Sequence, residues 1–122
     1  MTINEVINEV DALHRNSFDV SQKVAWLSRA DSIVQRMVLD GYENSGQAFS
    51  GYTSDTPGDT ELLMPAPFDA AYKHYLSAQI HHENQEMDKY NGSISEFDAL
   101  FNEYSAWYRR LHAVSRCQRF RF

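Results

Sequence analysis

Histidine and acidic residues in one predicted helix are the side chains closest in type to a metal site. His82 and Glu86 are four residues apart, which places them on one face of a helix. A carboxylate-bridged di-iron bundle takes Glu-x-x-His pairs from two helices, and the sequence contains no such pair. The adjacent His81 and His82 point about 100° apart on a helix. We therefore expect these residues, with His74 and Glu83, to lie on a solvated face, and we predict no metal.

Three acidic residues, Asp55, Asp59 and Glu61, gather in a polar stretch and could suggest calcium. A calcium loop of the EF-hand type has acids at alternate positions and a glycine at the sixth. The spacing of four and two residues found here does not fit that pattern. These acids are therefore predicted to belong to a solvated loop.

The single cysteine, Cys117, is the only candidate for a nucleophile of low pKa, because Arg116 and Arg119 lie beside it. His112 lies five residues before it, but nothing in the sequence implies a pocket around this terminal position. One cysteine cannot form a disulfide within the chain, which suits a reducing compartment. The glycines form no phosphate-binding motif. We therefore predict a protein that is not an enzyme and holds no cofactor.

The C-terminal residues 116–122 alternate arginine with phenylalanine. The net charge is −6 overall and +5 in residues 109–122, so residues 1–108 carry −11. The tail could contact nucleic acid through charge and base stacking. It could also insert into a neighbouring protein subunit, because arginine and aromatic residues are typical anchors. A frayed end that aids solubility is the third alternative.

The 122 residues fit one domain, with 43% hydrophobic and 23% charged residues, as in globular proteins. The first residues lack the basic and apolar regions of a signal peptide, and no apolar run is as long as a membrane span. We therefore expect a protein that remains in aqueous surroundings.

Apolar residues recur at helical spacing in four segments, which predicts an all-α bundle of about four helices. Thr2 and Glu5 form a capping box for a first helix that ends near His14. The second helix is expected from Ser21, as its cap, to Gly41. The third is expected over residues 67–90 and the fourth after a second capping box, Ser93 with Glu96. Only Asn91-Gly92 would separate these two, so they are predicted to form an antiparallel hairpin.

Residues 42–66 form a long connection rich in Gly, Ser, Thr and Asp, with a predicted turn at 56–59. Short extended pieces near residues 47–49 or 61–64 are compatible with this composition. A connection of this length inside a compact domain is usually functional or mobile. The predicted organisation is a helical domain over residues 1–115, which includes this loop, and a tail over residues 116–122.

Residues 59–69, Asp-Thr-Glu-Leu-Leu-Met-Pro-Ala-Pro-Phe-Asp, lead into a pattern of aromatic and other residues that continues through both later helices. The members of this pattern are Tyr72, Tyr75, Leu76, Ala78, Gln79, Ile80, Glu86, Tyr90, Asn91, Ser93, Phe97, Phe101, Tyr104 and Tyr108. Together with Lys23-Val24-Ala25-Trp26-Leu27 and the pair Ile33-Val34, the pattern resembles head–tail connector (adaptor) proteins of tailed bacteriophages and prophages of Gram-positive bacteria.

This resemblance implies a helical virion protein that forms a ring, usually of twelve copies, beneath the portal protein and extends the DNA channel. The ring would offer a surface to the next connector or tail-completion protein, and it would assemble in the host cytoplasm. The implied portal-facing residues are Arg109, Arg110, Arg116, Arg119, Phe120, Arg121 and Phe122. The implied neighbour-contacting residues are Tyr42, Phe49, Tyr52, Asp55 and Asp59.

Viral DNA would pass through such a ring without specific binding, and an acidic body agrees with this because it does not hold phosphates. The alternative function is a small helical module that binds nucleic acid through the Arg/Phe tail.

Overall fold

The structure is a computed structural model, and it describes residues 1–14, 16–37, 51–53 and 55–111. The helices are α1 (Ile3–Leu13), α2 (Val20–Met37), the short 3-10 helix η2 (Phe68–Ala70), α3 (Ala71–Glu83) and α4 (Met87–Leu111). These residues contain no strand, only an isolated bridge between Thr2 and Glu61. The predicted all-α fold is confirmed. No helix of the described ranges is long and apolar enough to cross a bilayer.

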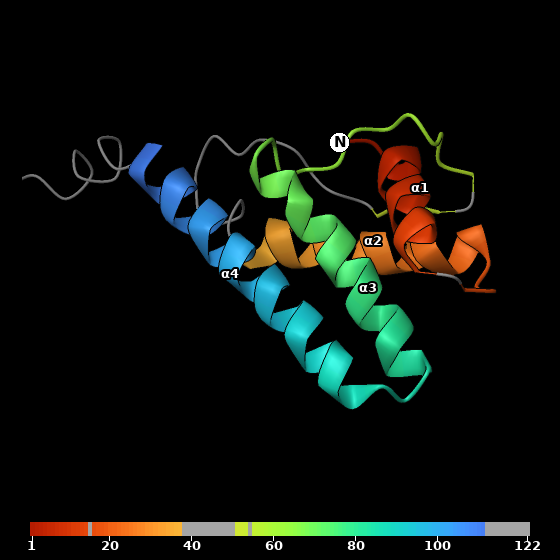
Figure 1. The fold of residues 1–122 in the computed structure, drawn as a ribbon. Helices are drawn as coiled ribbons and strands as arrows, with labels where there is room; N and C mark the ends of the chain where they lie inside the picture. Colours follow the sequence, from red (N-terminus) through yellow and green to blue (C-terminus); the bar gives the residue numbers. More distant parts are fainter. Residues whose placement is uncertain (15, 38–50, 54, 112–122) are drawn as a thin grey trace, which may run out of the picture.

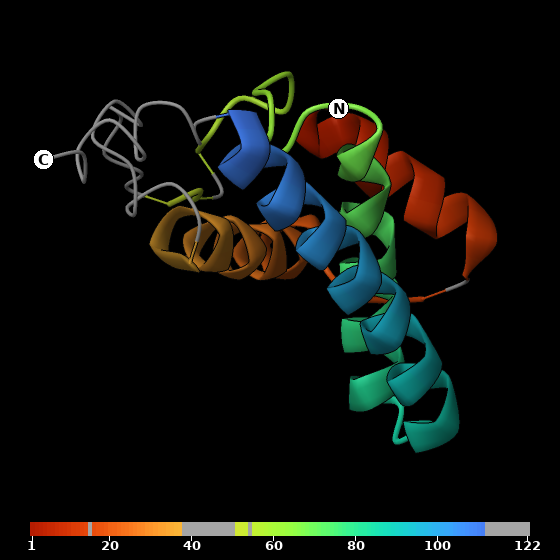
Figure 2. The ribbon, with the colours of Figure 1, turned by 90° about the vertical axis from the view of Figure 1, so that its left-hand side faces the viewer.

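Helix α3 lies at the centre of the molecule. It contacts α1, α2 and α4, whereas α4 packs on α3 and on η2. Figure 1 shows α2 crossing behind α3, with α1 and α4 on opposite sides of α3. Figure 2 shows the connected ends of α3 and α4 projecting beyond α2. The core combines apolar residues of all four helices with Leu62 and Met64 of the loop.

The start of α1 is held by its own cap and by the loop before α3. The Thr2 side chain accepts from the Glu5 N–H, and the Glu5 carboxylate accepts from the Thr2 N–H, as the sequence predicted. The next free helix N–H groups find partners in the loop: Ile3 donates to the Thr60 carbonyl and Asn4 to the Gly58 carbonyl. The first N–H groups of a helix have no partner within it, so the loop completes this end.

Helix α2 begins at Val20, earlier than predicted. The Asp19 carbonyl accepts from the N–H groups of Gln22 and Lys23, so Ser21 lies inside the first turn and does not cap the helix. Buried Lys23 forms a 2.7 Å ion pair with Asp11 of α1. This pair stabilises the contact between the first two helices.

Helix α3 is solvated only at its C-terminal end, which corrects part of the prediction. His81, expected on a solvated face, is buried, and so is Ser77, because other elements surround α3. His82 and Glu83 are exposed, as predicted, whereas His74 is half-buried. The spacing of polar residues could not show that three helices would surround this one.

The hairpin of α3 and α4 exists, but its turn lies at residues 84–86 and not at Asn91-Gly92. Gln85 has a φ of 61°, and its N–H donates to the His82 carbonyl. The Glu86 N–H donates to the His81 carbonyl. This pair of bonds is the Schellman motif that ends many helices. Asn91 through Ser93 therefore lie inside α4, and the predicted cap at Ser93 is wrong.

Candidate docking surfaces

The predicted portal-facing residues that the structure describes are Arg109 and Arg110, in the last turn of α4. Both side chains are exposed, and Arg109 Nη2 lies 3.4 Å from Ser105 Oγ of the preceding turn. Cations at this end of a helix are stabilised by its dipole. The remaining predicted contacts lie outside the described residues: Arg116, Arg119, Phe120, Arg121 and Phe122, with Tyr42 and Phe49 of the loop.

An aromatic cluster lies at the same end of α4. Phe68 of η2 packs against Tyr104 and Trp107, with ring centroids 5.5 and 5.4 Å apart. Tyr108 packs on Tyr104 at 6.0 Å and on Trp107 at 6.4 Å. Tyr104 is buried, and burial together with Tyr108 and Asp31 raises its pKa to about 12. Phe68, Trp107 and Tyr108 remain half-exposed, so large rings stay accessible beside the two arginines.

The part of the loop that the structure describes is attached to the helices. The Tyr52 N–H donates to Ser28 Oγ of α2 at 3.0 Å. Gly51 has a φ of 95°, and a Cβ there would lie 3.0 Å from Ser28 Oγ, so glycine permits this close approach. At Gly58, a Cβ would lie 2.3 Å from the Asn4 side chain. Two glycines thus let the loop follow the surfaces of α2 and α1.

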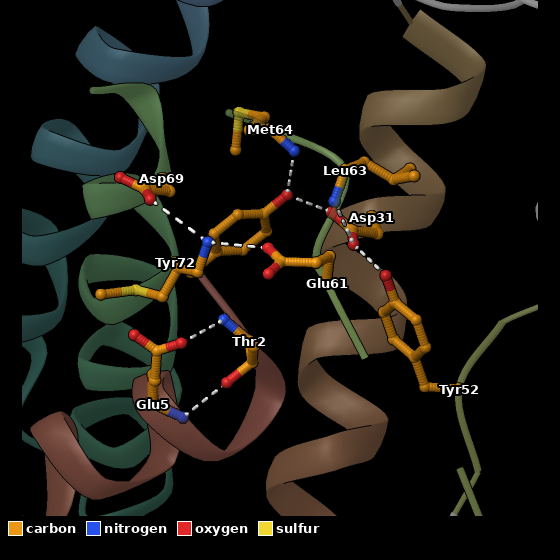
Figure 3. A network of polar contacts seen from close by, with 10 residues as sticks. Thr2, Glu5, Asp31, Tyr52, Glu61, Leu63, Met64, Asp69 and Tyr72 are labelled. Atoms are coloured by element: carbon orange, nitrogen blue, oxygen red, sulfur yellow. Dashed lines mark hydrogen bonds and ion pairs between the residues drawn. The ribbon is translucent and has the colours of Figure 1, made fainter. Parts of the chain in front are cut away.

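A buried carboxylate, Asp31 of α2, holds the loop from inside (Figure 3). The Tyr52 and Tyr72 hydroxyls each donate to it at 2.5 Å, and the Leu63 N–H donates at 3.2 Å. The Tyr72 hydroxyl in turn accepts from the Met64 N–H at 2.7 Å. Burial raises the pKa of Asp31 against the effect of these three hydrogen bonds. Burial and the neighbouring Asp31 raise the pKa of Tyr72, which keeps its hydroxyl a donor.

The predicted neighbour-contacting residues therefore differ in their surroundings. Asp55 and Asp59 are exposed, as expected for solvated loop acids, and so is Glu61. The amine of Met1 lies 3.2 Å from Glu61 and 3.4 Å from Asp69. Tyr52 instead directs its hydroxyl into the protein, and its side chain is only half-exposed.

Sequence reasoning did not identify the Asp31 network, although one signal was present. Asp31 follows Val24 and Leu27 at helical spacing and precedes Val34, so it occupies a position of the apolar stripe. A carboxylate in such a position can be buried only when hydrogen-bond donors from other segments pair with it. The donors come from segments 21 to 41 residues away, which no local pattern reveals.

The histidines form a second feature, an open groove between the end of α1, α3 and the first half of α4. Its volume is about 510 Å³, and His14, His74 and His81 contribute to its walls. Within the described ranges, no group of three or more His, Cys, Asp or Glu side chains could hold a metal ion.

Comparison with known proteins gives no relative: no protein-family profile, no curated protein and no solved structure matches the chain.

Proposed function

We propose that this protein is a structural docking subunit, and specifically a head–tail connector that forms a ring beneath a phage portal. The observation that carries the proposal is the C-terminal end of α4, where, among the described residues, half-exposed aromatic rings and two exposed arginines lie together. Tryptophan, tyrosine and arginine are the residues that most often dominate the binding energy of protein interfaces. The sequence resemblance supplies the identity of the partners.

The lengths of the helices explain why no other helix of the described residues covers this end. Helix α4 has 25 residues, whereas η2 and α3 have 3 and 13. At 1.5 Å per residue, α4 is roughly 37 Å long and its antiparallel partner segment roughly 24 Å. Phe68 packs opposite Trp107, so the last turn of α4 extends past its support, as Figure 1 shows. Leu111 in that turn is 62% exposed.

A ring requires two different surfaces on each copy, because head-to-tail contacts close into rings. The C-terminal end of α4 is one such surface in this proposal. The other surface in this proposal is the loop that carries exposed Asp55 and Asp59. Tyr52 and Leu63 attach this loop to α2, because both donate hydrogen bonds to Asp31. An acidic body, with a charge of −11 over residues 1–108, agrees with a channel through which DNA slides.

Co-purification with the portal protein from the same genome, followed by electron microscopy, tests the proposal. We expect portal to retain this chain and ring-shaped particles to form. The double variant Arg109→Glu/Arg110→Glu should weaken retention by about tenfold or more, since reversed charges oppose the docked arrangement. Arg36→Glu, an exposed change in the last turn of α2, is the matched control. A portal that never retains the wild-type chain would refute the connector role.

A further inference from the structure

The groove beside the histidines has a distinct side-chain chemistry. Its polar lining consists of three imidazoles, one ammonium, one hydroxyl and one carboxylate: His14, His74, His81, Lys89, Ser93 and Glu96. They come from the C-terminal cap of α1, from α3 and from α4. The groove therefore lies where three elements meet, on a side of the molecule that the proposed function does not use.

One end of the groove holds nitrogen donors and is named the cationic end for Lys89, which Glu86 neutralises by an ion pair; the other end holds the Glu96 carboxylate. At the first, the edge of one imidazole meets the face of another, because the His14 and His81 ring centroids are 5.0 Å apart and perpendicular within about ten degrees. Lys89 belongs to this end and lies 3.0 Å from Glu86, which also accepts from His81 at 3.2 Å. Glu96 lies two helical turns further along α4, roughly 10 Å away.

Space is available above α4 at the cationic end. A Cβ at Gly92 would meet no atom within 4 Å, so the groove is open above this residue of α4. The neighbouring Ser93 offers a hydroxyl that can donate to a bound group. Gly92 has no backbone need for glycine, since Gly51 is the one glycine of positive φ among the described residues.

Burial, and then neighbouring positive groups, disfavour the protonation of His14 and His74. Burial lowers the pKa of His14, and His81 and Lys89 lower it further, against the opposing effect of Glu86. Burial and Lys73 lower the pKa of His74, against Glu96 and Glu9. Both rings are therefore neutral near pH 7, and each proton that they take up adds positive charge beside Lys89 or Lys73.

We propose that this groove binds a tetrahedral oxyanion of the phosphate class between His14, His81, Lys89 and Ser93. Imidazole and ammonium N–H groups and a hydroxyl are suitable donors to such an anion. A bound dianion offsets the repulsion between protonated His14 and Lys89, so binding and proton uptake by His14 strengthen each other. The two-turn distance to Glu96 keeps the anion at the cationic end.

Histidine ring NMR titrations with sulfate provide the test, because sulfate remains a dianion throughout the range from pH 5 to 8. Sulfate is compared with chloride at constant ionic strength. We expect sulfate to raise the pKa of His14 by about 0.5 or more, equivalent to a threefold or larger change in affinity between its protonation states. Lys89→Gln, at an exposed position, should abolish most of this shift.

His82 is the internal control, because it is exposed, packs on Tyr90 and does not line the groove. Equal titration of His14 in sulfate and chloride, or an equal shift of His82, overturns the proposal and means non-specific screening only. A short single-stranded oligonucleotide at matched phosphate concentration identifies the source: a His14 shift with both probes indicates backbone phosphate, and a shift with sulfate alone indicates a small free anion. Neither result depends on the connector role, which the portal experiment tests separately.

Discussion

Asp31 occupies a position of α2 where the spacing of Val24, Leu27 and Val34 would place an apolar side chain. The carboxylate is fully buried, and two tyrosine hydroxyls and one backbone N–H donate to it. All three partners are donors and the carboxylate is an acceptor only, so its polar atoms are satisfied. One residue thereby links α2, α3 and two points of the loop.

Replacing Asp31 with asparagine should lower the free energy of unfolding by about 1–3 kcal/mol, because the amide NH₂ faces donors and leaves one of them unpaired. Urea denaturation followed by circular dichroism measures the change. Asp98→Asn is the matched control, since Asp98 is exposed on α4. If the two variants unfold at the same urea concentration, the network does not stabilise the fold.

The half-buried histidines predict how stability depends on pH. The pKa values of His14 and His74 are lowered from 6.5 in the folded protein, by burial first and then by neighbouring positive groups. The unfolded chain therefore binds more protons below pH 6.5, and this contribution to stability is present above pH 6.5 and lost as the pH falls. Unfolding measured from pH 7.5 to 5 should show the decline.

The double variant His14→Gln/His74→Gln isolates this contribution. Its stability should change less over the same pH range than that of the wild type. A wild-type protein that becomes more stable on acidification through pH 6 would contradict the assignment.

At the scale of elements, the turn between α3 and α4 does not lie at the strongest local turn signal of the sequence. Asn-Gly is a strong turn signal, yet Asn91 and Gly92 are helical. Residues 84–86 form the turn, and Glu86 there accepts from His81 and Lys89. The hairpin position also lets Phe97 pack on Tyr75 and Tyr104 on Phe68, at centroid distances of 5.0 and 5.5 Å. Packing over the whole hairpin outweighs the propensity of two residues.

Gly92→Ala distinguishes the two arrangements. In the interior of α4, with open space around it, alanine should raise the free energy of unfolding by about 0.5–1 kcal/mol. At a turn that requires a left-handed backbone, the same change would destabilise the protein. Thermal unfolding measures the sign, and a lower melting temperature for the variant would favour the turn at Asn91-Gly92.

Gln85→Gly tests the observed turn directly. Gln85 has a φ of 61°, a region that glycine adopts without a steric penalty. We expect the free energy of unfolding of the variant to be about 1 kcal/mol higher, because glycine avoids the steric cost of a left-handed backbone at a residue that has a Cβ. Asn84→Gly in the same turn is the control, because Asn84 has a φ of −86° and gains nothing from glycine. Equal effects of both changes would argue against this helix end.

At the scale of the whole molecule, the loop and the bundle are interdependent. Loop carbonyls accept from the first N–H groups of α1, loop residues Leu62 and Met64 enter the core, and Tyr52 donates to Asp31. The loop base is therefore part of the folded domain. Asp55 and Asp59 of this loop are exposed, and so are Arg109 and Arg110 at the end of α4.

The distribution of charge over the molecule predicts weak affinity for nucleic acid. With a net charge of −6, the full chain should not retain duplex DNA near 150 mM salt, because phosphate contacts supply non-specific affinity. A fluorescence anisotropy titration measures this. Salt-sensitive binding that disappears when residues 116–122 are deleted would instead support the nucleic-acid-binding alternative.

The sequence by itself determined the all-α class, the capping box of α1 and the pairing of two aromatic-rich helices as a hairpin, because these follow from helical spacing and from contacts between near neighbours. The tertiary structure alone decided that Ser77 and His81 are buried and that Asp31 meets two tyrosines. It also decided where the hairpin turns. Each of these depends on atoms brought together from distant segments, and the spacing of residues within one segment carries no record of them.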